Sequence, residues 1–279
     1  MGYLNSHSGL FTDFYELTMA QAYFITGKYK ERAVFDYFFR KTPFNGGFVI
    51  FAGLETLVNA LKEIKFEEDD LEYLVYLGFQ KNFLDYLKNF RFKGNVYSVE
   101  EGEVVFPQEP IIRVEGNLLE TQIIETLLLN IINFQSLIAT KARRIKLMAG
   151  DRLVIDFGLR RSQSLAGIYA SRASVIGGVE QTSNVYSAFM FGIKPSGTMA
   201  HSFIQSFDSE FEAFDTYSDI YPEKTVLLVD TYSTIKSGIP NAIKIAKKLE
   251  RKGFKLSGIR IDSGDISKLS KIARKILDS

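Results

Sequence analysis

The second half of the chain constrains the fold most, because apolar segments of strand length alternate there with segments of helical periodicity. The strand-like segments are 152–161, 193–203, 224–232 and 254–265. Strands separated by helices favour parallel βα units, since two parallel strands need a long crossover between them. Their nearly continuous apolar runs are typical of a sheet that is covered on both faces. These residues therefore predict a parallel α/β domain.

The first half mixes helical and strand patterns. The expected elements are a helix at 13–26, a strand at 32–44, a strand leading into a helix at 46–64, one or two helices at 67–90, antiparallel strands at 94–118, and a long apolar helix or helix pair at 119–148. Gly27 and Gly150 stand where two of these helices should end. This order predicts an N-terminal α+β domain at 1–120 and an α/β barrel domain at 121–279.

Composition narrows the function classes. The 34 basic and 33 acidic residues give a net charge of +1, so no field of one sign suggests a nucleic-acid or membrane partner. The chain has no cysteine, which excludes disulfides, thiolate metal sites and thiol nucleophiles. The longest apolar run, 123–134, is too short to span a bilayer and predicts a buried helix. The N-terminus has no basic and apolar leader, so we expect a cytoplasmic protein.

Polar and ionisable residues occupy the tail of each strand-like segment. They lie at 156–161, 197–201, 230–232 and 260–265. Arginine gives bidentate bonds to phosphates and carboxylates, glycine lets backbone N–H groups approach an oxyanion, and carboxylates stabilise cations. In a barrel such residues collect at the carboxyl ends of the strands. An open doubly wound sheet is the competing architecture, and its sites also lie at strand ends.

Each of these residues also has a structural interpretation. Asp156 could cap a helix or pair with an arginine, and Arg160 with Arg161 could form a solvated face. The sequence "DSGD" at 262–265 is a common turn and helix cap, and a single histidine is more often structural than catalytic. Recurrence at every strand end favours a functional site over these alternatives. His7, the other histidine, belongs to no motif and is left unassigned.

Taken together, these segments resemble the nicotinate phosphoribosyltransferase family. The motifs that carry the resemblance are "TDFYELTMAQAYF", "FDYFFRKTPFNGGFVIFAGLE", "DFGLRRSQ", "TSN", "GTMAHSFIQSF", "LLVDTYST" and "GIRIDSGD". The resemblance implies a type II phosphoribosyltransferase α/β barrel beside a smaller domain. It also implies transfer of the phosphoribosyl group of 5-phosphoribosyl 1-pyrophosphate to nicotinate. The products are nicotinate mononucleotide, a precursor of NAD, and pyrophosphate.

The resemblance also assigns roles to residues. It implies that ATP hydrolysis is coupled to transfer through phosphorylation of His201, with the carboxylate of Asp230 nearby, and that Arg260 and Asp262 lie near the phosphates and the ribose. A neutral imidazole is a competent nucleophile near pH 7, and small neighbours leave room for a phosphoryl group. The implied substrate-binding residues are Tyr15, Phe157, Arg160, Arg161, Gly197, Thr198, Arg260, Ser263 and Gly264.

Among these residues, Phe157 would stack on the pyridine ring, and Tyr15 would supply the opposing ring from a second subunit. Arg160 and Arg161 would contact the substrate carboxylate or a phosphate, which favours nicotinate over the neutral amide. The resemblance further implies Mg²⁺, with its ligands undetermined, ATP as co-substrate, and a homodimer with shared sites.

Four βα units cannot close a barrel of the family type. We therefore expect an incomplete barrel, with further strands and a glycine-rich 5′-phosphate loop after residue 279. Two alternatives stay open beside the nicotinate enzyme. One is a nicotinamide phosphoribosyltransferase, to which the chain has a looser resemblance. The other is a non-catalytic nucleotide-binding or assembly fragment of such an enzyme.

Overall fold

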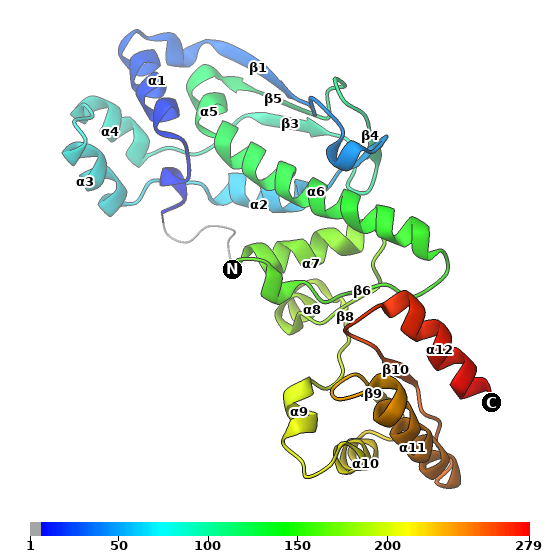
Figure 1. Ribbon diagram of the computed structural model, residues 1–279. Coiled ribbons are helices and arrows are strands. Elements are labelled where there is room, and N and C mark those ends of the chain that lie inside the picture. Colours follow the sequence, from blue (N-terminus) through cyan, green and yellow to red (C-terminus); the bar gives the residue numbers. More distant parts are fainter. Residues whose placement is uncertain (1–6) are drawn as a thin grey trace. The chain divides into compact units, whose positions relative to one another are not determined.

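The structure is a computed structural model that describes residues 7–279, and it divides into two compact units, residues 1–196 and 197–279 (Figure 1). Residues 1–6 lie outside the described residues. They belong to the N-terminal segment in which we expect no signal peptide. Each unit has a hydrophobic core of its own and is described by itself.

The first unit opens with two antiparallel sheets and six helices. The strands are β1 (Arg32–Tyr37), β2 (Val49–Ile50), β3 (Asn95–Ser98), β4 (Val104–Val105) and β5 (Ile112–Asn117). The helices are α1 (Phe14–Ile25), α2 (Leu54–Glu63), α3 (Glu68–Tyr76), α4 (Lys81–Lys88), α5 (Leu118–Ile123) and α6 (Glu125–Ala149). One sheet has the order β1-β5-β3, and the other pairs β2 with β4. The antiparallel strands expected at 94–118 are confirmed.

Helix α6 runs through the core of the first unit (Figure 1). It contacts α2, β2 and α7 (Ala166–Ile176), and it ends at Gly150, whose φ of +59° suits glycine. The segment Leu118–Ala149 is long and apolar enough to cross a membrane, but 56% of its most apolar window is buried inside the protein. Ile124, Leu127 and Ile131 are among its buried residues. The buried helix expected at 123–134 is therefore confirmed.

Short parallel strands follow α6 and complete the first unit. They are β6 (Ile155–Asp156), β7 (Gln181–Thr182) and β8 (Lys194–Pro195), and they form one sheet in the order β6-β7-β8. Helix α7 connects β6 to β7, and α8 (Val185–Phe191) connects β7 to β8. Strand β7 was not predicted, because residues 181–182 lie within a stretch with a helical pattern.

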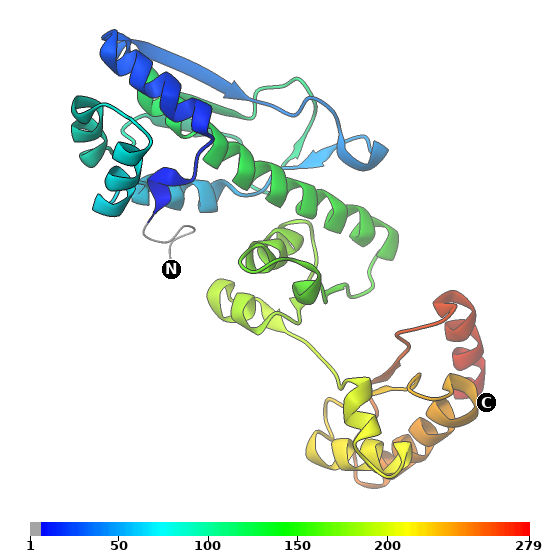
Figure 2. The ribbon, with the colours of Figure 1, turned by 60° about the vertical axis from the view of Figure 1, so that its left-hand side comes forward.

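The second unit packs four helices around two parallel strands. Its elements are α9 (His201–Gln205), α10 (Glu210–Ile220), β9 (Val226–Leu228), the π-helical turn η5 (Thr234–Gly238), α11 (Ile239–Arg251), β10 (Gly258–Arg260) and α12 (Ile266–Asp278). Figure 2 shows α10 and α11 side by side, in agreement with their contacts. Buried Phe214, Leu227, Ile245 and Leu249 form the centre of the core. The strands expected at 224–232 and 254–265 are present but shorter.

Two expected strands need larger corrections. The strand predicted at 193–203 is wrong beyond residue 195, since α9 begins at His201. Pro195 is the last residue of β8 and has no N–H donor, and Gly197 is flexible, so the strand does not continue past Pro195. The strand predicted at 152–161 covers only Ile155–Asp156, and a 3₁₀ turn occupies Leu159–Arg161. The Asp156 carboxylate accepts a hydrogen bond from the Gly158 N–H at 2.8 Å, which turns the chain out of the sheet.

The fold class agrees with the expectation of an incomplete barrel. Within residues 7–279 the parallel strands form a three-stranded and a two-stranded sheet, and they close no barrel. The boundary expected between residues 120 and 121 remains a prediction. The N-terminal core extends beyond it, because Leu127 and Ile132 pack with Leu17 and Phe51 in one cluster.

Candidate active site

The second unit gathers several of the expected site residues at the carboxyl ends of β9 and β10. The two strands are parallel neighbours, and the Val229 N–H donates to the Arg260 carbonyl at 3.0 Å. Asp230 follows β9, and Asp262 follows β10. His201 begins α9, whose N-cap is Ala200. We call His201, Asp230 and Asp262 the His201 cluster.

The imidazole of His201 lies between the two carboxylates of the cluster. Its Nε2 atom is 3.9 Å from Asp230 Oδ1 and 3.9 Å from Asp262 Oδ2. On the other side of the ring, Nδ1 is 3.1 Å from the hydroxyl of Thr231. The imidazole is 40% exposed, so a reactant can reach it. Thr231 lies in the predicted polar tail 230–232 and in the motif "LLVDTYST", but no role was predicted for it.

Asp230 is the buried member of the cluster, with a side chain only 2% exposed. Its Oδ2 atom accepts hydrogen bonds from the Asp262 N–H at 2.9 Å and from the Ser263 hydroxyl at 2.6 Å. Its Oδ1 atom is buried and has no hydrogen-bond partner within residues 7–279; it faces His201. Buried carboxylate oxygens are normally hydrogen-bonded, so this atom points to a function that needs a free acceptor.

Arg260 connects the cluster to the turn before α9. Its Nη1 donates to the Thr198 hydroxyl at 2.9 Å, while Nε and Nη2 donate to Asp262 Oδ1 at 3.2 and 2.7 Å. These bonds fix the Asp262 carboxylate with its second oxygen toward His201. Gly197 lies beside Thr198 with open space around its Cα, and Gly264 adopts a φ of +75°, which suits glycine. All of the expected residues of the second unit thus lie in or next to one cluster.

In the first unit, the tail of β6 is held by a buried hydrogen-bond network around Asp156. Asp156 Oδ2 accepts from the Ser171 hydroxyl at 2.7 Å and from the Thr182 hydroxyl at 2.9 Å, while Oδ1 accepts from the Gly158 N–H. Asn184 donates its side-chain amide to the Ser171 hydroxyl at 3.2 Å. Ser171, Thr182 and Asn184 are at most 1% exposed. Asp156 therefore neither caps a helix nor pairs with an arginine, the two interpretations that the sequence offered.

This network fixes the backbone on both sides of Phe157. The Phe157 ring is 40% exposed, and Arg160 and Arg161 are exposed on the following 3₁₀ turn. Neither arginine makes an ion pair with any residue from 7 to 279. A ring and two guanidinium groups are thus accessible next to a rigid strand end. The motif "TSN" at 182–184 contained the signal for this network, but its hydrogen bonding could not be read from the sequence.

Tyr15 lies on α1 of the first unit and is 46% exposed. Its hydroxyl donates to Glu16 Oε1 at 3.3 Å. Partial burial, with the negative charges of Glu16 and Glu125, raises the pKa of Tyr15 to about 12, so the hydroxyl remains a donor at neutral pH. His7, which we left unassigned, contacts Asp70 at 2.5 Å beside the capping box of α3, which is a structural role.

The His201 cluster suits a Mg²⁺ ion that is held mainly by phosphates. Mg²⁺ usually keeps water and binds one or two carboxylates plus substrate oxygens. Residues 7–279 contain no group of three or more His, Asp or Glu side chains arranged as a closed metal site. The free Oδ1 of Asp230, with Asp262 nearby, is the donor set that fits such an ion.

Comparison with solved structures identifies the class of fold. The chain superimposes on human nicotinic acid phosphoribosyltransferase with a TM-score of 0.89 and 31% identity, over 96% of this chain and 64% of that one. A nicotinate-nucleotide pyrophosphorylase from Pyrococcus furiosus matches with a TM-score of 0.79 and 26% identity, over 99% of this chain and 65% of that one. The fold is that of the type II phosphoribosyltransferases.

Sequence comparison identifies the family. Residues 10–133 match the nicotinate phosphoribosyltransferase N-terminal domain, and residues 153–278 match the nicotinate phosphoribosyltransferase family. The chain is 46% identical to the nicotinate phosphoribosyltransferase of Bacillus subtilis and 44% identical to nicotinate phosphoribosyltransferase pncB2 of Mycobacterium tuberculosis, over 99% of its length in both cases. The chain belongs to the nicotinate phosphoribosyltransferase family. It spans 56% and 59% of the lengths of these two relatives.

Proposed function

We propose that this protein transfers the phosphoribosyl group of 5-phosphoribosyl 1-pyrophosphate to nicotinate in NAD biosynthesis. The pyridine nitrogen forms the new bond to the anomeric carbon of the ribose as the bond from that carbon to pyrophosphate breaks. Positive charge develops on the sugar and negative charge on the leaving pyrophosphate, so carboxylates and arginines must stabilise both. The products are nicotinate mononucleotide and pyrophosphate.

The proposal rests on the geometry around His201 Nε2. Asp230 Oδ1, which has no hydrogen-bond partner among residues 7–279, lies 3.9 Å from this nitrogen, and Asp262 Oδ2 also lies 3.9 Å from it. The Thr231 hydroxyl, 3.1 Å from Nδ1, can accept a hydrogen bond from a protonated Nδ1. Nε2 is then unprotonated and faces the side on which Asp230 and Asp262 lie. The lone pair of Nε2 is the nucleophile that we propose for the γ-phosphoryl group of ATP.

Phosphorylation of His201 would couple ATP hydrolysis to transfer. The bond between the γ-phosphorus and its bridging oxygen breaks, ADP leaves, and the phosphoryl group moves to the imidazole. Water later releases it as inorganic phosphate. Mg²⁺, held by the phosphates with Asp230 and Asp262, would neutralise the developing charge on the phosphate oxygens. The surrounding Arg260 and Ser263 would contact phosphate or ribose oxygens.

The pyridine ring would bind between aromatic faces. Phe157 supplies one exposed ring beside the fixed Asp156 network, and Tyr15 of a second copy of the chain would supply the other. Arg160 and Arg161, which form no ion pair with residues 7–279, would bind the substrate carboxylate, which is why we favour nicotinate over nicotinamide. The family resemblance further suggests that Gly197 and Thr198 shape the pocket for the substrate carboxylate. This arrangement requires a homodimer.

The proposed setting is the cytoplasm, without a nucleic-acid or membrane partner. The near balance of charge supports this, since it provides no field for either partner.

Measurement of product formation tests the function. The protein is incubated with 5-phosphoribosyl 1-pyrophosphate, Mg²⁺ and ATP, and either nicotinate or nicotinamide, and the mononucleotide is quantified by chromatography. We expect kcat/KM to favour nicotinate by about 100-fold or more, since a site built for a charged group rejects the neutral analogue. A higher kcat/KM with nicotinamide would overturn the assignment of nicotinate as the substrate. Binding of nicotinate without product from either base would support the non-catalytic alternative instead.

A further inference from the structure

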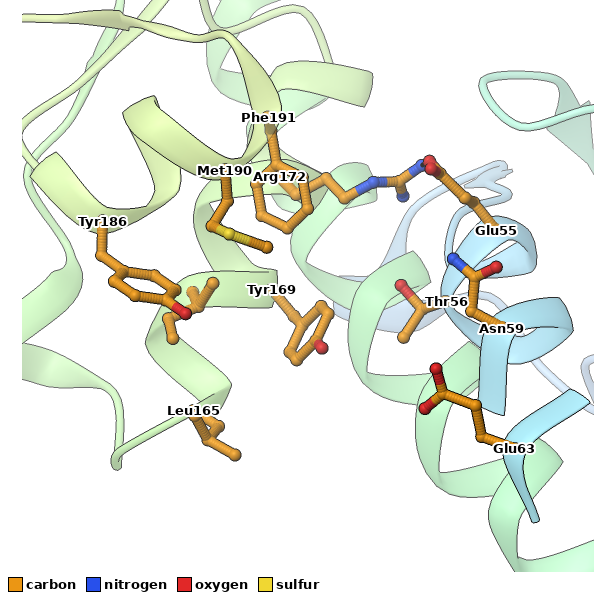
Figure 3. A pocket seen from close by; sticks show the side chains of 11 residues that line it. Glu55, Thr56, Asn59, Glu63, Leu165, Tyr169, Arg172, Tyr186, Met190 and Phe191 are labelled. Carbon is orange, nitrogen blue, oxygen red and sulfur yellow. Dashed lines mark hydrogen bonds and ion pairs between the residues drawn. The ribbon is translucent and has the colours of Figure 1, made fainter. Parts of the chain in front are cut away.

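A cavity in the first unit is lined by none of the residues that we place in the active site. It has a volume of about 410 Å³ and lies between α2, α7 and α8 (Figure 3). A cavity of this size is large enough for a small organic molecule. Its two walls differ in chemistry, and that difference indicates which class of molecule it would hold.

One wall of the cavity is acidic and belongs to α2. Glu55, Asn59 and Glu63 are spaced by four residues, so they lie on one face of the helix. Figure 3 shows these three side chains, together with Thr56, along the same side of the cavity. Glu63 takes part in none of the ion pairs formed by residues 7–279, and its side chain is exposed. This carboxylate is therefore available to a ligand.

Arg172 of α7 is the one cationic side chain among the residues that line the cavity, and its charge is already neutralised. Its guanidinium donates to Glu55 at 2.5 Å and to the two carboxylate oxygens of Glu101 at 2.9 and 2.6 Å. Two carboxylates thus share one guanidinium, and Glu63 adds a third negative charge. The cavity as a whole is electronegative, which disfavours an anionic ligand.

The opposite wall consists of aromatic side chains and a methionine. Tyr169 comes from α7, and Tyr186, Met190 and Phe191 come from α8. Figure 3 shows these side chains facing the acidic wall across the cavity. Aromatic faces attract cations, and a methionine thioether adapts to irregular apolar groups. Burial, followed by the charges of Tyr186 and Glu63, raises the pKa of Tyr169, so its hydroxyl stays protonated and can donate.

We propose that this cavity binds an organic cation, a primary or quaternary ammonium group carried on an apolar body. The ammonium group would lie toward Glu63 and Asn59, and the apolar body would lie against Tyr169, Tyr186 and Met190. Cation and carboxylate attract each other, and the aromatic wall favours the same charge. The proposal is independent of the proposed transferase function, because the two sets of residues do not overlap.

A matched series of probes tests the charge preference. The probes are 2-phenylethylamine, 2-phenylethanol and 3-phenylpropanoate, which share a phenyl body but are a cation, a neutral molecule and an anion at pH 7. Binding to the protein is measured by calorimetry and by ligand-detected NMR. We expect the cation to bind about tenfold more tightly than the alcohol, and the anion not to bind measurably. Equal affinities for cation and alcohol, or no binding of the cation, would overturn the proposal.

Two variants locate the site. Glu63→Gln removes an exposed charge without changing shape, and it should weaken 2-phenylethylamine binding about fivefold while leaving 2-phenylethanol unchanged. Glu72→Gln, which removes an exposed glutamate of α3 outside the cavity, is the matched control and should change neither affinity. If Glu63→Gln binds the cation as well as the wild type does, the cation does not use this cavity and the proposal is wrong.

Discussion

The carboxylate of Asp230 accepts a hydrogen bond from the backbone N–H of Asp262 at 2.9 Å, so the tail of one strand fixes the carboxylate that follows its neighbour. This bond and the one from Ser263 occupy a single oxygen of Asp230 and leave the other directed at His201. The arrangement provides a carboxylate that is both immobile and chemically available.

Asp230→Asn tests the role of the Asp230 charge in turnover separately from its role in stability. Asparagine keeps one oxygen as an acceptor for the two donors, but it removes the negative charge beside His201. We expect ATP-coupled turnover to fall about 100-fold, since one oriented electrostatic group typically contributes that much, while the free energy of unfolding falls by at most about 2 kcal/mol. Steady-state kinetics and urea unfolding measure the two effects. Asp208→Asn, at an exposed aspartate, is the control. Unchanged turnover in Asp230→Asn would contradict the assigned role.

Ser171→Ala tests whether the Asp156 network positions Phe157. The Ser171 hydroxyl donates to Asp156, whereas the buried Ser174 hydroxyl on the same helix donates only to the Ser171 carbonyl. Ser174→Ala should lose about 1 kcal/mol of stability through one lost hydrogen bond, and Ser171→Ala about 2 kcal/mol, because the Ser171 hydroxyl also donates to the Gly167 carbonyl and accepts from Asn184. Only Ser171→Ala should also weaken nicotinate binding, by about fivefold, because a misplaced ring stacks less well. Equal nicotinate affinities of the two variants, measured by calorimetry, would show that the network is structural only.

The ion pair of Glu101 with Arg172 predicts a pH dependence of stability. Burial opposes ionisation of Glu101, but the bonds from Arg172 and from the N–H groups of Gly53 and Leu54 outweigh it and lower its pKa. A lowered carboxylate pKa stabilises the fold above the unfolded pKa, about 4.3, and the stabilisation is lost as pH falls below it.

Glu101→Gln should therefore destabilise the protein by about 3 kcal/mol at pH 7, because it leaves Arg172 partly unpaired in a buried site. The difference from wild type should shrink as pH falls below about 4, where the wild-type carboxylate becomes protonated. Denaturant unfolding at several pH values measures this, with Glu100→Gln, at an exposed neighbour, as the control. A difference that is constant with pH would contradict the electrostatic explanation.

Tyr15→Ala should weaken nicotinate binding and leave the fold intact. The ring is 46% exposed on α1, so its removal should cost no more than about 1 kcal/mol of stability. Loss of the proposed opposing aromatic face should raise the nicotinate Kd about tenfold. Thermal unfolding and calorimetry measure the two quantities. A large fall in stability would instead show that the Tyr15 ring packs in the core, and it would contradict the proposal that Tyr15 contacts nicotinate in the partner's site.

Sequence patterns predicted the long elements of the fold well. The apolar stripe of α6 and the glycine at 150 mark a buried helix and its end, and the alternation at 94–118 marks antiparallel strands. Strand β7 was missed because its residues, Gln181 and Thr182, are polar. Thr182 is buried because its hydroxyl donates a hydrogen bond to Asp156, and a pattern of apolar residues cannot reveal a strand whose residues are polar.

In the candidate active site, too, some features were predicted from the sequence and others were not. Strand ends in the second unit were predicted to bring Asp230, Arg260 and Asp262 together, and the register of β9 with β10 does so. The strand predicted through His201 is wrong, and the histidine starts a helix instead. Thr231, Ser171 and Arg172 were not predicted as partners, because each acts through a contact with a residue distant in sequence. Their bonds depend on tertiary structure that no local pattern encodes.

We propose above that His201 accepts a phosphoryl group on Nε2, the ring nitrogen that faces Asp230 and Asp262. Intact-mass spectrometry of the protein after incubation with ATP and Mg²⁺ tests it most directly, and His7→Ala provides the control because His7 is the other histidine of the chain. We expect an acid-labile phosphoryl adduct in the wild type and in His7→Ala, and none in His201→Ala. An adduct that persists in His201→Ala, or nicotinate transfer coupled to ATP without any adduct on His201, would contradict it.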